Sequence, residues 1–132
     1  MTPALWTSIV RFEANPLDKA RTNSYDIKHM NKNYMRALPK EWRPMAKVFI
    51  ALGDEHRQRI MLTFQKGERL TVGQISAVST LSRPAVSHHL KILRAAGVLE
   101  SEKIGKEVYL RVNKQMLEET FTDVLGYVRE NA

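Results

Sequence analysis

Apolar residues recur at intervals of three and four through the middle of the chain, which is the spacing of one face of an α-helix. This pattern predicts a helix over Trp42–Leu52 and another over Glu55–Lys66. Gly53 is expected to end the first helix, Asp54 to cap the second, and Gly67 to mark where the second ends. The residues expected to face inward are Met45, Ala46, Phe49 and Leu52 in the first helix and Ile60, Met61 and Phe64 in the second.

Two more predicted helices follow, separated by a short polar turn. Thr71-Val-Gly-Gln74 has the form of a capping box, and Ser82 caps a longer helix that ends in a Schellman motif at Gly97. Pro84 is tolerated because amides in the first helical turn have no intrahelical partner. Two short helices joined by three or four turn residues are typical of a helix-turn-helix. The expected inward residues are Val72, Ile75 and Val78 in the short helix, Leu81 in the turn, and Val86, Leu90 and Leu93 in the longer helix.

The pattern changes to strict alternation after Gly97. Val98–Lys103 and Glu107–Val112 flank a short turn at Ile104-Gly105-Lys106, which predicts a β-hairpin or wing. Asn113 then caps a last helix. The predicted fold is mainly α with a β-hairpin wing, a winged helix-turn-helix of order α-α-α-α-β-β-α. The apolar residues of the last helix are Leu117, Phe121, Val124, Leu125 and Val128.

The first 40 residues differ from the rest of the chain in having weak periodicity. We expect residues 1–40 to form a partly helical extension, with a helix around Tyr25–Leu38, and residues 41–132 to form the winged helix-turn-helix domain. No apolar run approaches the roughly 18–20 residues of a membrane span. The apolar segment Met1–Val10 has no basic region like that of a secretory signal, so we expect a cytoplasmic protein with no membrane partner.

The charge distribution favours a polyanionic partner. The chain carries 21 Lys and Arg against 14 Asp and Glu, a formal net charge of +7. The excess is spread over residues 1–111, whereas residues 112–132 are net acidic. Binding to phosphates would release counterions, although many basic proteins bind no nucleic acid.

The helix after Ser82 has an outward face suited to the DNA major groove. At 100° per residue, His88 and Lys91 lie opposite the apolar stripe, and no acid occurs in residues 83–99. His89 lies at the edge of the stripe and is expected to be partly packed and to donate to phosphate. A solvated helix face is the alternative. The expected DNA-binding residues are Ser82, Arg83, Pro84, Ser87, His88, His89 and Lys91 in the helix, and Lys103, Lys106 and Arg111 in the wing.

The sequence gives no support for catalysis, a metal or a cofactor. The absence of cysteine excludes thiolate sites, and no two of the four histidines are spaced i, i+3 or i+4 on a helix. A site that combines His29 and His56 in three dimensions stays open. No acid or nucleophile lies at productive spacing from His88 or His89, so we expect no enzyme and no catalytic residues.

Three segments together resemble the ArsR-type winged-helix repressors. They are Ala51–Met61, the recognition-helix signature Leu81–Leu99, and the wing Gly105–Val112. The resemblance implies a homodimer that places two recognition helices in successive major grooves of an inverted repeat and represses by blocking a promoter. It implies a dimer interface between the first and last helices, although some of its members face the core of one chain. The candidates are Met45, Phe49, Leu117, Phe121, Val124, Leu125 and Val128.

The departures from the family pattern concern its regulation. Metal sensors of this family often have a Cys-x-Cys pair in the region of Thr71–Val78, or Asp and His ligands on the last helix. This chain has no cysteine and no histidine in the last helix. It is therefore similar to the cysteine-free autorepressors, which respond to a partner protein, an organic ligand or expression level. The alternatives are a winged-helix protein-interaction module and a metal-responsive repressor with an atypical His/carboxylate site.

Overall fold

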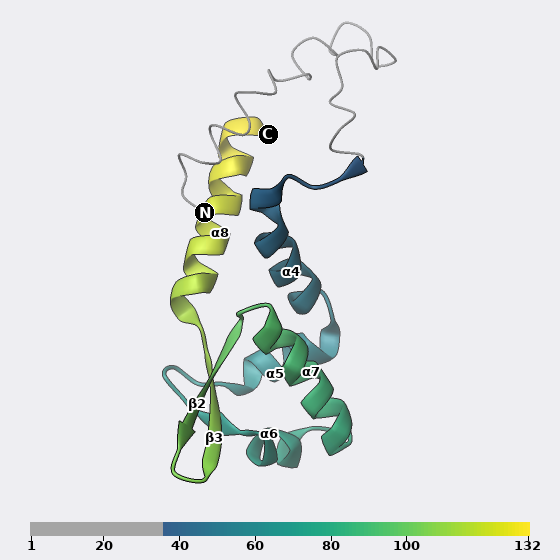
Figure 1. Ribbon diagram of the computed structural model, residues 1–132, viewed down its shortest axis with the longest axis vertical. Helices are drawn as coiled ribbons and strands as arrows, with labels where there is room; N and C mark the ends of the chain where they lie inside the picture. The colour runs from purple at the N-terminus through teal and green to yellow at the C-terminus, as the bar shows by residue number, and fades with distance from the viewer. Residues whose placement is uncertain (1–35) are drawn as a thin grey trace, which may run out of the picture. The chain divides into compact units, whose positions relative to one another are not determined.

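The computed structural model describes residues 36–132, which form helices and a small antiparallel sheet (Figure 1). The predicted order of helices and hairpin strands is confirmed. The expected extension and its helix around Tyr25–Leu38 fall largely on residues 1–35, outside the described residues, as does His29. The elements are η2 (Lys40–Trp42), α4 (Arg43–Leu52), α5 (Glu55–Thr63), β1 (Leu70–Thr71), α6 (Val72–Val78), α7 (Arg83–Ala95), β2 (Leu99–Ile104), β3 (Glu107–Val112) and α8 (Lys114–Asn131).

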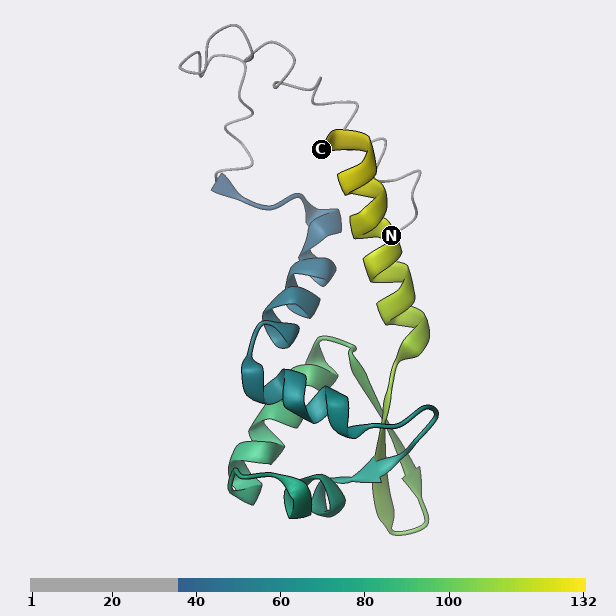
Figure 2. The same cartoon turned by 180° about the vertical axis from the view of Figure 1, so that it is seen from behind.

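Pro44–Leu117 forms one compact unit with a continuous apolar core. Val86, Leu90 and Leu93, the residues of α7 predicted to face inward, are at most 2% exposed. Leu81, in the turn before α7, packs against the same core. Figure 2 shows α5, α6 and α7 grouped beside the β2–β3 hairpin. The buried members of the core are Val48, Ala51, Ile60, Ile75, Val86, Leu90, Leu93, Val98, Leu99 and Leu110.

Residues 36–43 and Glu118–Ala132 belong to a second unit. In it, the rings of Trp42 and Tyr127 meet edge to face with centroids 5.2 Å apart. Asp123 is 3% exposed. Among the described residues, no helix is long and apolar enough to cross a membrane.

The predicted inward stripe of α4 was partly wrong. Met45 is buried as expected, but the other buried residues are Val48 and Ala51, while Phe49 is 42% exposed. The helix is apolar around most of its circumference, so helical spacing alone allowed more than one stripe.

Two helix features in the α5–α6 region also differ from the prediction. Helix α5 ends at Thr63 rather than Lys66, because Phe64 turns into an extended conformation and packs against the core. Gly67, with φ of 71°, lies in the following loop instead of ending the helix. Val78 is 71% exposed, because α6 is only seven residues long and turns Ile75 alone fully inward.

The sheet has one strand more than predicted. Leu70 pairs with Leu110 and Thr71 with Tyr109, so β1 extends the hairpin to the order β1-β3-β2. Within the hairpin, β2 starts at Leu99 rather than Val98, and Ile104 pairs with Glu107, which leaves a two-residue turn at Gly105-Lys106. Gly105 has φ of 62°, as the first turn residue of a type II′ hairpin requires.

Candidate nucleic-acid interface

The predicted caps hold the helix-turn-helix in place. Thr71 Oγ1 accepts from the amide of Gln74 at 3.1 Å, while the amide of Thr71 donates to Gln74 Oε1 at 2.9 Å. Ser82 Oγ accepts from the amide of Ala85 at 3.3 Å and starts α7. Both caps satisfy amides that have no intrahelical partner, so the capping predictions are confirmed.

A Schellman motif ends α7 as predicted. The amide of Val98 donates to the carbonyl of Leu93, and that of Gly97 donates to the carbonyl of Arg94, both at 3.0 Å. Gly97 has φ of 82°, a conformation that costs an L side chain strain. The motif leads directly into β2 and so sets where the wing begins.

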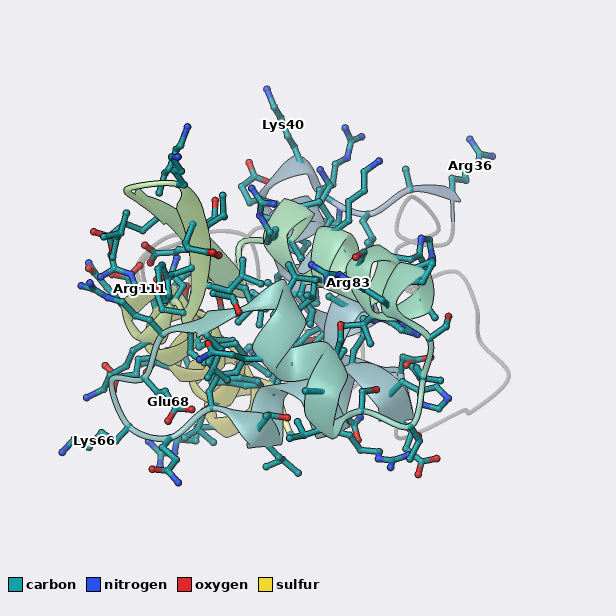
Figure 3. All side chains as sticks on the ribbon, turned by 90° about the horizontal axis from the view of Figure 1, so that it is seen from below. Arg36, Lys40, Lys66, Glu68, Arg83 and Arg111 are labelled. Atoms are coloured by element: carbon teal, nitrogen blue, oxygen red, sulfur yellow. The ribbon has the colours of Figure 1, made fainter. Side chains whose placement is uncertain are left out.

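The outward face of α7 carries small, hydrogen-bonding and cationic groups. No acid lies anywhere in this helix or in the turn that follows it. Figure 3 views this region from the side of α6 and α7 and labels Arg83 on α7. The predicted contact residues that the structure places in exposed positions here are Ser82, Arg83, Pro84, Ser87, His88 and Lys91.

A groove of about 890 Å³ separates α7 from the hairpin. Ser87, Lys91 and Arg94 line its helix side, and Ser101 and Val108 line its wing side. The guanidinium of Arg94 donates from Nη2 to Ser101 Oγ at 2.9 Å and so ties α7 to the wing. The prediction missed Arg94, although its position one turn after Lys91 places it on the same flank.

The wing places its three predicted cations on different surfaces. Lys103 and Lys106 are exposed, the latter in the turn itself. Arg111 alternates with the buried Leu110, so it points away from the core, on the outer side of the hairpin in Figure 3. Its Nη2 lies 3.0 Å from Glu100 Oε2 on the paired strand, which partly balances its charge. The structure therefore does not group Arg111 with the cations of the groove.

His89 is half-buried against α5 rather than free at the surface. Its Nδ1 lies 3.2 Å from Nη1 of Arg57, a residue that the sequence did not single out. Burial lowers the pKa of His89 below its ordinary value of 6.5. The ring of His56 lies 5.7 Å from that of His89, centroid to centroid. The contact between Arg57 and His89 joins residues 32 positions apart in the sequence, which is too far for any local sequence pattern to predict it.

The residues predicted for a dimer interface differ in exposure. Met45 is only 4% exposed and has little surface left for a partner, and Leu117 is half-buried against the core. On α8, Phe121, Leu125 and Val128 are each 46–48% exposed. Phe49 on α4 is also exposed, and Val124 is half-buried.

No group of three or more His, Cys, Asp or Glu within residues 36–132 could hold a metal ion. The pairing of His29 with His56 lies partly outside these residues and stays a prediction.

The pKa of Asp54 is lowered, chiefly because its carboxylate accepts from the amide of Arg57 at 3.1 Å as the cap of α5.

The capped helix-turn-helix, the hairpin wing and the acid-free helix face define a winged-helix DNA-binding protein. Residues 54–101 match the family model described as "Bacterial regulatory protein, arsR family". The chain is 33% identical over 86 residues to the transcriptional repressor SdpR of Bacillus subtilis, covering 65% of this chain and 94% of that protein. It is 31% identical to the transcriptional repressor SmtB homolog of Synechocystis sp., covering 66% of this chain and 65% of that protein.

Solved structures agree with these matches. An ArsR-like transcriptional regulator from Rhodococcus sp. RHA1 superposes with a TM-score of 0.65 at 28% identity, over 70% of this chain and 86% of that one. HlyU from Vibrio cholerae superposes with a TM-score of 0.53 at 26% identity, over 65% of this chain and 90% of that one. The chain belongs to the ArsR family of bacterial regulatory proteins. It is a DNA-binding transcriptional regulator, and the family consists of regulators rather than enzymes.

Proposed function

We propose that the protein is a homodimeric transcriptional repressor that binds an inverted repeat in double-stranded DNA and blocks a promoter. The observation that carries the proposal is the outward face of α7, which is exposed, basic and free of acids. Such a face can enter the major groove without repelling the phosphates on either side. The relatives named as repressors, SdpR among them, support the direction of regulation.

The proposed contacts divide into two kinds. Ser87, His88 and Lys91 lie on the outward face of α7 and are proposed to meet base edges, because their side chains can hydrogen-bond in the major groove. Lys103 and Lys106 on the wing would bind phosphate and orient the protein without contributing base preference. The remaining proposed contacts are Ser82, Arg83, Pro84 and His89 at the helix, and Arg111 on the outer wing face.

Self-association is proposed to involve the exposed apolar face of α8. Phe121, Leu125 and Val128 recur at helical spacing and remain nearly half exposed in the single chain. Burying such a stripe against a second copy would remove apolar surface from water. Phe49 is proposed to join this interface, whereas Met45 is set aside because it is already buried. Residues 41–132 would then carry DNA binding and dimerisation, with residues 1–40 as an extension.

The regulatory input is proposed to be a partner protein or an organic ligand rather than a thiolate-bound metal. Some relatives are named for cadmium or arsenic resistance, but this chain has no cysteine to bind a soft metal. Metal analysis of the purified protein tests this statement, and stoichiometric zinc would contradict it.

The function is tested by selecting bound duplexes from a random or genomic pool at physiological salt. We expect an inverted repeat whose half-sites lie about one helical turn apart. Sedimentation of the complex should give two protein chains per duplex. If the protein shows only weak, salt-sensitive binding without a preferred sequence, the proposal is wrong and the fold serves as a protein-interaction module.

A further inference from the structure

Arg57 on α5 makes three side-chain contacts within the Pro44–Leu117 unit. Its Nε donates to the carbonyl of Ala51 at 2.7 Å, and its Nη2 donates to the carbonyl of Ile50 at 3.2 Å. Both carbonyls lie in the last turn of α4, where backbone acceptors have no partner within the helix, and the carbonyl of Ile50 also accepts from the amide of Gly53 at 3.3 Å. The third contact, from Nη1, reaches Nδ1 of His89 on α7 at 3.2 Å. The two carbonyls at the end of α4 therefore fix the orientation of the guanidinium, which in turn contacts the ring of His89.

This contact determines which ring nitrogen of His89 carries the proton. A guanidinium has donors and no acceptor, so Nδ1 must be unprotonated to accept from it. A neutral imidazole with a free Nδ1 carries its proton on Nε2. Burial lowers the pKa of His89, Asp54 opposes this effect, and the charges of Arg57, His56 and His88 reinforce it. The contact with Arg57 and the lowered pKa of His89 therefore both favour the neutral imidazole with its proton on Nε2.

We infer that Arg57 is a positioning residue for DNA binding, which holds the imidazole of His89 so that its Nε2–H donates to a phosphate oxygen of the DNA backbone. The inference rests on the proposed DNA-binding function. Nε2 lies across the ring from Nδ1 and so on the side away from Arg57, and His89 is next to the exposed His88 on α7. A ring that is already held in one orientation loses less conformational freedom when DNA binds.

The inferred role differs from that of a surface cation. Lys or Arg binds phosphate through charge, and the contact weakens as salt rises because counterions are no longer released to the same extent. A neutral imidazole contributes a directed hydrogen bond and orients the helix relative to the backbone. The loss of the His89 contact should therefore lower affinity with little change in its salt dependence.

A pair of substitutions at position 89 tests the Nε2–H donor while leaving Arg57 in place. His89→Asn keeps an acceptor near the position of Nδ1 but has no group near Nε2, whereas His89→Gln can bring an amide N–H to the Nε2 position. For the duplex that wild-type protein selects, we expect His89→Asn to weaken binding about fivefold for each protomer, the equivalent of one net hydrogen bond, and so about 25-fold for the dimer. His89→Gln should retain most of the affinity. Equal affinities of the two variants would overturn the inference.

Nitrogen-15 spectra of the histidine side chains test the positioning role without DNA. In the wild-type protein we expect Nδ1 of His89 to be unprotonated and Nε2 protonated. Arg57→Met should mix the two tautomers and weaken DNA binding. The matched control is Arg59→Met, which removes the same charge from an exposed position on α5 and should leave the His89 spectrum unchanged.

The outcomes separate the inference from the proposed function. If Arg57→Met and the wild-type protein show the same His89 tautomer, Arg57 does not position the ring and the inference is wrong, whatever the DNA affinity. If wild-type protein selects no duplex, the proposed function fails and the donor role fails with it, while the spectra still decide whether Arg57 sets the tautomer.

Discussion

Helices α7 and α8 are both amphipathic, yet they leave very different side chains in contact with solvent. Helix α7 buries Val86, Leu90 and Leu93 completely and exposes polar and basic groups. Helix α8 fully buries only Asp123 and leaves apolar side chains nearly half exposed, in a segment that is net acidic. Apolar residues at helical spacing occur in both, so periodicity alone does not distinguish a core helix from a helix that associates with another chain. The exposed chemistry makes that distinction, and it supports a polyanion as the partner of α7 and a second copy as the partner of α8.

The largest expected effect separates the buried stripe of α7 from exposed apolar residues elsewhere. Leu93→Ala removes a side chain that is 0% exposed, so it should lower the free energy of unfolding by about 3 kcal/mol through lost burial and a cavity. Leu62, at 84% exposed, provides the control, and Leu62→Ala should change stability by less than about 0.5 kcal/mol. Urea denaturation measures both. Similar midpoints for the two variants would contradict the assignment of α7 as the centre of the core.

A charge placed on the apolar face of α8 should break the proposed dimer. Leu125→Glu would bury a carboxylate in the interface, so we expect monomers in sedimentation and a loss of operator affinity of about a hundredfold, because two half-sites no longer bind together. Gln115→Glu adds the same charge at an exposed position of α8 that lies ten residues, or about 15 Å along the helix axis, from Leu125, and this variant should remain dimeric. A monomeric wild-type protein would refute this interface.

The outward face of α7 is tested by its effect on base preference. Replacing Ser87 and His88 together by Ala should reduce discrimination against a mismatched operator about tenfold, because hydrogen bonds to base edges carry the preference. Binding to unrelated duplexes should change little. The measurement is a competition titration with matched and mismatched duplexes. Undiminished discrimination would show that other residues read the sequence.

Lys106 in the wing turn should affect all sequences alike. Lys106→Ala is expected to weaken binding about threefold for each protomer on operator and unrelated duplexes alike, and to reduce the slope of log affinity against log salt by about two for the dimer. Affinities measured at several salt concentrations give both quantities. A selective loss at the operator would instead place Lys106 at a base edge.

The smallest expected effect is a pH dependence of stability from His89. Its pKa is lower in the folded protein than the ordinary 6.5, so the unfolded chain binds more protons as pH falls below about that value. The contribution of neutral His89 to the free energy of unfolding should therefore be fully present above about pH 6.5. It should be lost as the pH falls through the folded pKa of His89. Asp54 adds a separate loss at more acidic pH, since its pKa is lowered from 3.8.

Chemical denaturation at a series of pH values from about one unit above to about one and a half units below the ordinary histidine pKa measures this contribution. His89→Gln should flatten the slope. His56 and His88, whose rings lie 5.7 and 5.8 Å from that of His89, are retained in that variant. An unchanged slope would show that His89 is not the source of the pH dependence.

Local sequence patterns determined the parts of this protein that neighbouring residues can build. The capping box at Thr71, the cap at Ser82 and the Schellman ending at Gly97 each depend on residues within about five positions of one another, and the inward stripe of α7 recurs every three or four positions; all are as predicted. The acid-free outward face follows from the same helical spacing. These local features are the reason why the sequence alone identified the helix-turn-helix and the proposed DNA-binding residues on it.

Only the tertiary structure decided the features that depend on distant residues. The inward face of α4 was ambiguous because nearly every side of that helix is apolar, and packing against α5 to α7 selected Val48 and Ala51. The two-residue strand β1 exists because Leu70 and Thr71 find partners on β3, about forty positions later. The contact between Arg57 and His89, and that between Arg111 and Glu100 across the hairpin, likewise arise only when the folded backbone brings those side chains together. Short-range hydrogen bonds can be deduced from spacing, whereas long-range contacts depend on how the whole core packs.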